Sequence, residues 1–332
     1  MSKINCKPCF AFDALAAMAL REANLNGFRN DIPYVKEQIE ENFEGLDIPG
    51  SDSYFGLLTN RYSFEEIEKM DLKVLTEVYT NCIKGNEFEG KFLKGLKILK
   101  DIDFTRLWEE HCLTFLKKQC DDYKAVLETE NKMVAGVLSD IQYIKPNEKI
   151  DDINIYMTYF TQCVSFVVGK NSYITNHNGN DEINIKNVLR LFTHELTHGV
   201  SNEKTRKIYI EICEKDEFLK KSKNILVNKK ACTSNEEEFV VALDNYISLK
   251  NGLISKKEAT NNIFNHYESC MPIAVIIFDE LIKWGKLPED INSWIYDLFA
   301  SGIIKAGEIE SKVNNIMPGY VDNFMNICFN KK

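Results

Sequence analysis

Two histidines four residues apart flank a glutamate in the segment Leu191–Gly199, where His194, Glu195 and His198 form the pattern His-Glu-x-x-His. Residues four apart on an α-helix lie one above the other on the same face, so both imidazoles can point at a single ion. A carboxylate beside that pair can take a proton from a water molecule that the ion activates. Zinc is the expected metal, because it accepts nitrogen and oxygen donors in an open tetrahedral arrangement.

The residues around this pattern support a buried helix. Apolar side chains recur at helical intervals before and within it, at Ile185, Val188, Leu189, Phe192 and Leu196. Gly199 directly follows the second histidine, at a position where a helix would end. The competing interpretation is a pair of hydrogen-bonded histidines on a half-buried helix with no metal. The chain has only five histidines, so chance placement of two in this frame is uncommon.

A catalytic zinc site needs a third protein ligand, and three consecutive glutamates downstream are the candidates. Ser234 as N-cap would place Glu237 at the third helical position, and Glu236 would lie in the first turn, where a carboxylate complements the helix dipole. Glu238 begins the apolar run 239–243, where a carboxylate needs a strong partner such as a metal ion. We therefore predict Glu238 as the third ligand and Glu237 as the alternative. The competing interpretation is that all three are charges at a helix start.

With these residues, the sequence resembles the gluzincin class of zinc metallopeptidases: His194 and His198 match the two histidine ligands, and Glu195 matches the general base. The stretch Glu237–Val241 is similar to the E-E-F-x-A pattern around the third ligand in several bacterial members, with Val241 in place of Ala. More loosely, the whole chain is similar to uncharacterised bacterial proteins described as zincins. In those proteins a helical region precedes a small sheet and the His-Glu-x-x-His helix.

The resemblance implies a zinc-dependent peptidase in which Glu195 takes a proton from water and passes it to the leaving amine. It also implies that the substrate backbone adds as a strand to a sheet edge, at 153–160 or 164–169. Some members carry a catalytic tyrosine before the third ligand, and this sequence has none there. Three downstream residues are the candidate replacements for this transition-state donor: Tyr246, His266 and Tyr267.

The elements that must position these residues are mostly helical. Apolar spacing predicts helices over 10–23, 35–43, 72–83, 92–99 and 104–116. Alternation over 153–159 predicts a strand, and the apolar run 163–169 predicts its neighbour. We expect an α+β fold that is mostly α-helical, with a helical N-terminal region at 1–147. A zincin-like catalytic domain at 148–332 would contain the small β-sheet and the active-site helix.

Composition limits the class of partner. The 332 residues carry a formal net charge of −9 and no basic stripe, so a nucleic-acid partner is not expected. No stretch approaches the length of a membrane span. Ten scattered cysteines and the lack of a signal-peptide pattern indicate reduced thiols in a cytoplasmic protein. The expected partner is a peptide or protein substrate, and no pattern indicates an oligomeric state. Two alternatives keep the scaffold: a zinc hydrolase acting on another bond, or a non-catalytic binding module.

Overall fold

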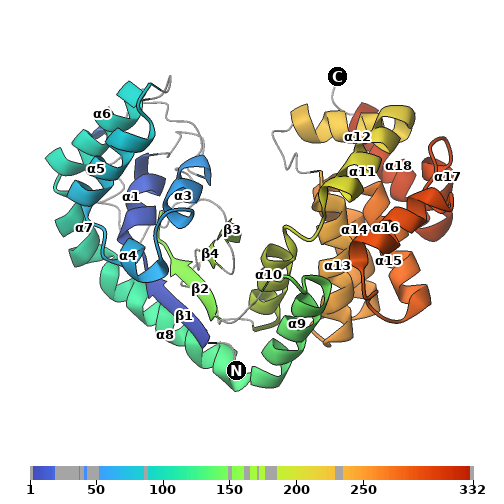
Figure 1. The fold of residues 1–332 in the computed structure, drawn as a ribbon, viewed down its shortest axis with the longest axis horizontal. Coiled ribbons are helices and arrows are strands. Elements are labelled where there is room, and N and C mark those ends of the chain that lie inside the picture. The colour runs from blue at the N-terminus through green and yellow to red at the C-terminus, as the bar shows by residue number, and fades with distance from the viewer. Residues whose placement is uncertain are drawn as a thin grey trace. The chain divides into compact units, whose positions relative to one another are not determined.

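The computed structural model describes most of the chain, and Figure 1 shows its helices and strands. The described residues are 3–18, 37, 41–42, 52–85, 89–148, 152–160, 165–169, 172–175, 185–228 and 235–329. Helices dominate and the strands form one small sheet, which confirms an α+β fold that is mostly α-helical. The chain divides into two compact units. We call them the sheet unit (Met1–Thr129 and Ile150–Ile183) and the helical unit (Glu130–Lys149 and Asn184–Lys332).

This division differs from the boundary expected between residues 147 and 148. The strands that follow residue 150 belong with the N-terminal part of the chain, whereas residues 130–149 belong with the C-terminal part. Strand pairing gives the reason, because a strand near the N-terminus pairs with one that follows residue 150. The small sheet and the histidine-bearing helix therefore lie in different units, not in one zincin-like domain at 148–332.

The sheet unit contains a helical layer and all the described strands. Its elements are β1 (Lys3–Pro8), α1 (Phe10–Met18), α3 (Asp52–Thr59), α4 (Phe64–Glu68), α5 (Leu72–Cys82), α6 (Glu89–Asp101), α7 (Phe104–His111), α8 (Leu113–Thr129), β2 (Asp152–Met157), β3 (Ser165–Gly169) and β4 (Ser172–Thr175). The helices expected over 72–83 and 92–99 are confirmed as α5 and α6. The helix expected over 104–116 divides into α7 and α8. The helix expected over 35–43 falls almost wholly outside the described residues.

The sheet has the strand order β1-β2-β4-β3. β1 and β4 both pair in parallel with β2, whereas β3 runs antiparallel to β4. The strands expected near 153–159 and 163–169 are confirmed as β2 and β3. β2 has a partner on each side, so the expectation that 153–160 offers a free edge is wrong; β3 forms an edge among the described strands. β1 was not expected, because the N-terminal part of the sequence was interpreted as helical.

A buried carboxylate joins three parts of the sheet unit. Asp13 lies on α1, which is buried along its whole length. Its Oδ1 accepts hydrogen bonds from the backbone amides of Tyr159 (2.6 Å) and Phe160 (2.9 Å), and its Oδ2 accepts one from Nε1 of Trp108 (2.7 Å). Burial raises the pKa of Asp13 to about 7, although these three donors oppose the rise. The carboxylate thus ties α1 to α7 and to the segment after β2.

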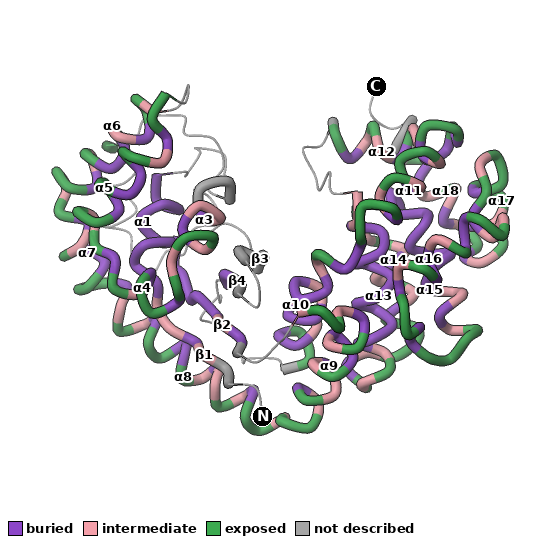
Figure 2. Tube along the Cα trace, viewed as in Figure 1, coloured by how far each residue is buried: buried purple, intermediate pink, exposed green. Residues whose placement is uncertain are grey.

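The helical unit contains no described strand. Its elements are α9 (Asn131–Ile144), α10 (Ile185–Thr197), α11 (Glu203–Lys215), α12 (Glu217–Asn228), α13 (Glu237–Lys250), α14 (Lys256–Asn265), the 3-10 turn η2 (His266–Glu268), α15 (Pro272–Trp284), α16 (Ile291–Ala300), α17 (Ile309–Ile316) and α18 (Tyr320–Phe329). α13 is the central helix, because it packs against α10, α14 and α15 and is buried from Glu237 to Ser248 (Figure 2). A helix that is buried on all sides presents its polar residues to other helices rather than to solvent.

Among the described parts of the chain, none of the helices combines the length with the apolar character that crossing a bilayer requires.

Candidate metal centre

The His-Glu-x-x-His pattern lies at the C-terminal end of α10, as expected. His194 is in the last turn, and His198 follows one residue after the helix ends at Thr197. Their imidazole rings meet edge to face, with centroids 5.1 Å apart. Gly199 then takes a left-handed conformation with φ of +80°, which confirms that the helix stops at this glycine. The two rings therefore lie on one side of the helix end, as the four-residue spacing requires.

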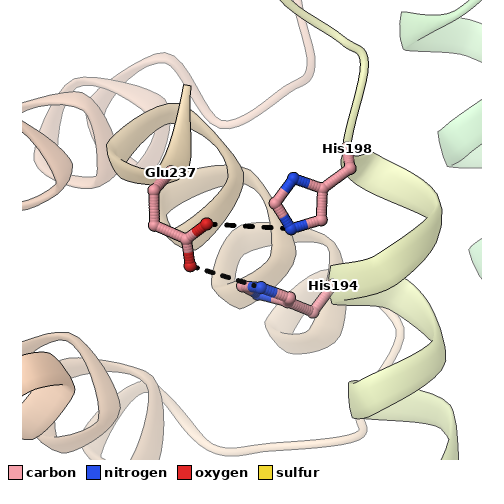
Figure 3. A group of neighbouring side chains, drawn as sticks. All are labelled: His194, His198 and Glu237. Carbon is pink, nitrogen blue, oxygen red and sulfur yellow. Dashed lines mark ion pairs between the residues drawn. The ribbon is translucent and has the colours of Figure 1, made fainter. Parts of the chain in front are cut away.

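The third member of the cluster is Glu237, from the first turn of α13. Its Oε1 lies 3.4 Å from Nε2 of His194, and its Oε2 lies 3.7 Å from Nε2 of His198 (Figure 3). The three side chains offer ligand atoms within 4.8 Å of one another, so they could hold a metal ion. Two ligand atoms of a tetrahedral zinc ion are separated by about 3.3 Å, given bonds of roughly 2.0–2.1 Å. The distances from Glu237 to the two imidazoles, 3.4 and 3.7 Å, are within a few tenths of an ångström of that value.

Glu238, the predicted third ligand, is not part of this cluster; the alternative, Glu237, is the glutamate that lies beside the two histidines. The Glu238 carboxylate accepts a hydrogen bond from the hydroxyl of Tyr209 (2.8 Å) and bonds from the first amides of α15, Ile273 and Ala274 (the latter 3.1 Å). The first amides of a helix have no acceptor within that helix, and the Glu238 carboxylate on α13 supplies one for the start of α15. Burial raises the pKa of Glu238 to about 7, against the effect of its three donors.

Helix geometry explains this exchange. Consecutive residues of an α-helix point about 100° apart, so Glu237 and Glu238 cannot both face α10. The prediction of Glu238 rests on the apolar run that follows it. Because α13 is buried on nearly all sides, that run does not distinguish the face toward the histidines from the face toward α15. Ser234, the expected N-cap, lies outside the described residues, and Glu236 is the residue that precedes the helix.

Glu236 supports His198 from behind. Its Oε1 lies 3.3 Å from Nδ1 of His198 and accepts a hydrogen bond from the amide of Gly199 (2.9 Å), while its Oε2 accepts one from the hydroxyl of Ser201 (2.7 Å). Burial opposes ionisation of this carboxylate, but the three partners lower the pKa of Glu236 to about 2. A carboxylate on Nδ1 fixes the ring orientation and leaves the Nε2 lone pair for a metal ion.

Asp244 supports His194 in the same way. Its Oδ2 lies 2.6 Å from Nδ1 of His194, and its Oδ1 accepts a hydrogen bond from the side-chain amide of Asn245 (2.6 Å). Burial lowers the pKa of His194, but Asp244 and Glu237 raise it well above the ordinary value. A metal ion would take the place of a proton at Nε2 of His194. Asp244 was not predicted from the sequence, although it follows Glu237 by two helical turns and so lies on the same face of α13.

Lys145, which the sequence analysis also missed, holds the end of α10. Its Nζ donates hydrogen bonds to the carbonyl oxygens of His198 (2.8 Å) and Leu196 (3.3 Å) and pairs with Glu148 at 2.7 Å. The last carbonyls of a helix have no amide partners within that helix, and a cation at this end is favourable. Lys145 thus fixes the chain where His198 leaves α10. No local sequence signal connects it to a helix some fifty residues later.

The expected catalytic base, Glu195, lies next to His194 on α10 and is buried, with 8% of its surface exposed. Of the three candidate transition-state donors, only His266 lies beside the cluster, with Nε2 3.6 Å from Oε1 of Glu237. Tyr267 contacts the His266 ring, with centroids 4.6 Å apart, and is more exposed. Tyr246 is buried within α13.

The electrostatics of the cluster favour an ionised third ligand. Burial raises the pKa of Glu237, yet the imidazoles of His194, His266 and His198 outweigh burial and hold it well below its usual range. A deprotonated carboxylate between two imidazoles is the protonation state that metal binding needs.

No protein-family model matches the chain, and no curated protein or solved structure shows significant similarity to it. The chemistry of the cluster is therefore inferred from its own side chains: two imidazoles with carboxylates behind them, one buried ionised carboxylate, and a glutamate next to the first histidine.

Proposed function

We propose that the protein is a zinc-dependent peptidase, with His194, His198 and Glu237 as metal ligands and Glu195 as general base. The observation that carries the proposal is the convergence of both Nε2 atoms on the Glu237 carboxylate, in a sequence frame that places Glu195 beside them. Two imidazoles and one carboxylate form a donor set that zinc accepts. Three protein ligands also leave a coordination position for water or substrate, which is typical of catalytic rather than structural sites.

When bound, zinc polarises the carbonyl group under attack and lowers the pKa of a water molecule to about 7. The residues of the chain do the rest. Asp244 accepts a hydrogen bond from the Nδ1–H of His194, and Glu236 accepts one from the Nδ1–H of His198. Each ring therefore has its unprotonated Nε2 free to bind the metal. Glu195 accepts a proton from the attacking water and passes it to the leaving amine. Burial of Glu195 and Glu237 strengthens these interactions, because charges interact more strongly away from bulk water.

The first experiment is a metal measurement on the full-length protein without a histidine tag. After dialysis against metal-free buffer and resupply of zinc, we expect one zinc per chain in the wild type and in Glu238→Ala. We expect none in Glu237→Ala. Circular dichroism of both variants establishes that each is folded. Wild-type protein that takes up no zinc would refute the proposed site, because His194, His198 and Glu237 would then be a hydrogen-bonded cluster only.

The second experiment tests the reaction. Zinc-loaded wild-type protein is incubated with an unfolded polypeptide, and new amino termini are counted with an amine-reactive dye. We expect cleavage by the wild type, none after chelation, and none by Glu195→Gln at undiminished zinc content, since the amide cannot accept the proton. Zinc binding without any cleavage would favour a hydrolase for another bond or a binding module. Cleavage by Glu195→Gln at the wild-type rate would remove the proposed base.

A further inference from the structure

His266 carries a buried nitrogen that the proposed mechanism does not use. It is the C-cap residue of α14, and its Nε2 has almost no contact with solvent and no hydrogen-bond partner among the described residues. Oε1 of Glu237 lies 3.6 Å from this nitrogen, just beyond hydrogen-bond distance. A buried polar nitrogen without a hydrogen-bond partner is costly and uncommon, so its position needs a reason.

The backbone around His266 is held in an uncommon conformation. Tyr267, Glu268 and Ser269 all have positive φ, at 43°, 57° and 63°, which non-glycine residues rarely adopt. Ser269 is fully buried, and its hydroxyl donates to the carbonyl of Phe264 (2.7 Å) and accepts from the side-chain amide of Asn323 (2.8 Å). Such a conformation persists only where its surroundings enforce it. The strained residues directly follow His266, whose imidazole lies beside Glu237.

A carboxylate that gives one oxygen to a metal ion leaves the other oxygen needing a donor. Glu237 is only 5% exposed, so solvent contributes little to that second oxygen. Its Oε1 faces Nε2 of both His194 (3.4 Å) and His266 (3.6 Å), whereas its Oε2 faces His198. His266 is not part of the group whose ligand atoms lie within 4.8 Å of one another. It lies beside one member of that group, Glu237.

From this geometry, and resting on the proposed function, we infer that His266 is a positioning residue: its Nε2–H donates to the Glu237 oxygen not used by the metal. The donor keeps Glu237 monodentate and so preserves the open coordination position that catalysis needs. His266 would thereby do for the carboxylate ligand what Asp244 and Glu236 do for the two imidazoles.

Zinc affinity, measured by competition with a chromophoric chelator on the untagged full-length chain, tests the inference without reference to turnover. We expect His266→Met, which has no donor, to bind zinc about 10–100-fold more weakly than the wild type. His266→Gln keeps an N–H donor at the end of its side chain and should recover most of that loss. His111→Gln, which removes an α7 histidine in the sheet unit, is the matched control and should bind like the wild type.

A second readout is the visible spectrum of the cobalt-substituted protein, which reports the coordination number. We expect His266→Met to absorb more weakly than the wild type, because a bidentate Glu237 would raise the coordination number, and His266→Gln to retain the wild-type intensity. Wild-type zinc affinity in His266→Met would overturn the inference and leave the proposed peptidase intact, even if turnover fell. A wild-type protein without zinc would overturn both. Loss of affinity in Met and Gln variants alike would also count against the donor role.

Discussion

The Asp244 carboxylate lies 2.6 Å from Nδ1 of His194, two helical turns after Glu237 on α13. One helix therefore supplies both the carboxylate that would bind a metal ion and the carboxylate that orients one of the imidazoles. Glu236, immediately before the same helix, orients the other imidazole. The histidine pair on α10 and the acidic face of α13 form a site that depends on how these two helices pack.

We expect Asp244→Ala to lower the zinc affinity of the protein by 10–100-fold, because His194 loses the partner that fixes its ring and tautomer. Chelator competition measures the effect. Asp279→Ala is the control, since that carboxylate pairs with Lys283 on α15 and is not part of the cluster of His194, His198 and Glu237. Equal affinities for Asp244→Ala and the wild type would show that His194 does not need this partner.

Glu238→Ala should destabilise the metal-free protein by about 1–3 kcal/mol, because the first amides of α15 and the Tyr209 hydroxyl lose a buried acceptor. Denaturant unfolding followed by circular dichroism gives the change in free energy. Glu237→Ala should leave the α15 amides with their acceptor, so its free energy of unfolding should fall less than that of Glu238→Ala. In the zinc measurement, Glu237→Ala should lose the metal. A Glu238→Ala protein as stable as the wild type would contradict the capping role.

Lys145→Met should lower the free energy of unfolding by about 1.5–3 kcal/mol, because the ammonium donates to two backbone carbonyls at the end of α10 and is 11% exposed. Lys283→Met is the matched comparison: its ion pairs are at the surface, with the ammonium side chain 58% exposed, so a loss of about 0–1 kcal/mol is expected. Similar losses in the two variants would argue that Lys145 is an ordinary surface ion-pair partner.

Asp13 makes the stability of the protein depend on pH. Its pKa is about 7 in the folded state against a reference of 3.8, so the folded state binds this proton more tightly than the unfolded state. The stabilisation is fully present below the unfolded pKa of about 4 and is lost as pH rises through about 7. Asp13→Asn, which is neutral at every pH, should remove this part of the decline when unfolding is measured between pH 4.5 and 8. An unchanged slope in Asp13→Asn would exclude Asp13 as its source.

The histidine pair was predictable because everything that places it is local. The four-residue spacing, the apolar face of α10 and the terminating Gly199 belong to one short segment, and helical geometry converts that spacing into convergence. β2 and β3 were predictable for the same reason, since alternation marks a half-buried strand wherever its partner lies.

Which of the three glutamates lies beside the histidine pair was not predictable from the sequence. The apolar run after Glu238 indicated a helix in the core. Which of its side chains face the histidines depends on how that helix is turned about its own axis, and packing against both α10 and α15 decides this. The N-terminal strand was missed for a related reason. β1 is six residues long and pairs with β2 across a separation of 149 residues, as the contact of Asn5 with Asn154 shows. No window of the sequence contains both strands.

The interleaved order of the two units has a practical consequence for anyone who wants to express them separately. A fragment cut at residue 148 would carry the histidine helix without α9 or Lys145, and would leave β1 without its neighbouring strand. During synthesis, β1 cannot pair until β2 has left the ribosome, whereas the helices that pack against α1 all come earlier in the chain. Separate production of the helical unit therefore calls for a fusion of residues 130–149 to residue 184 through a new linker.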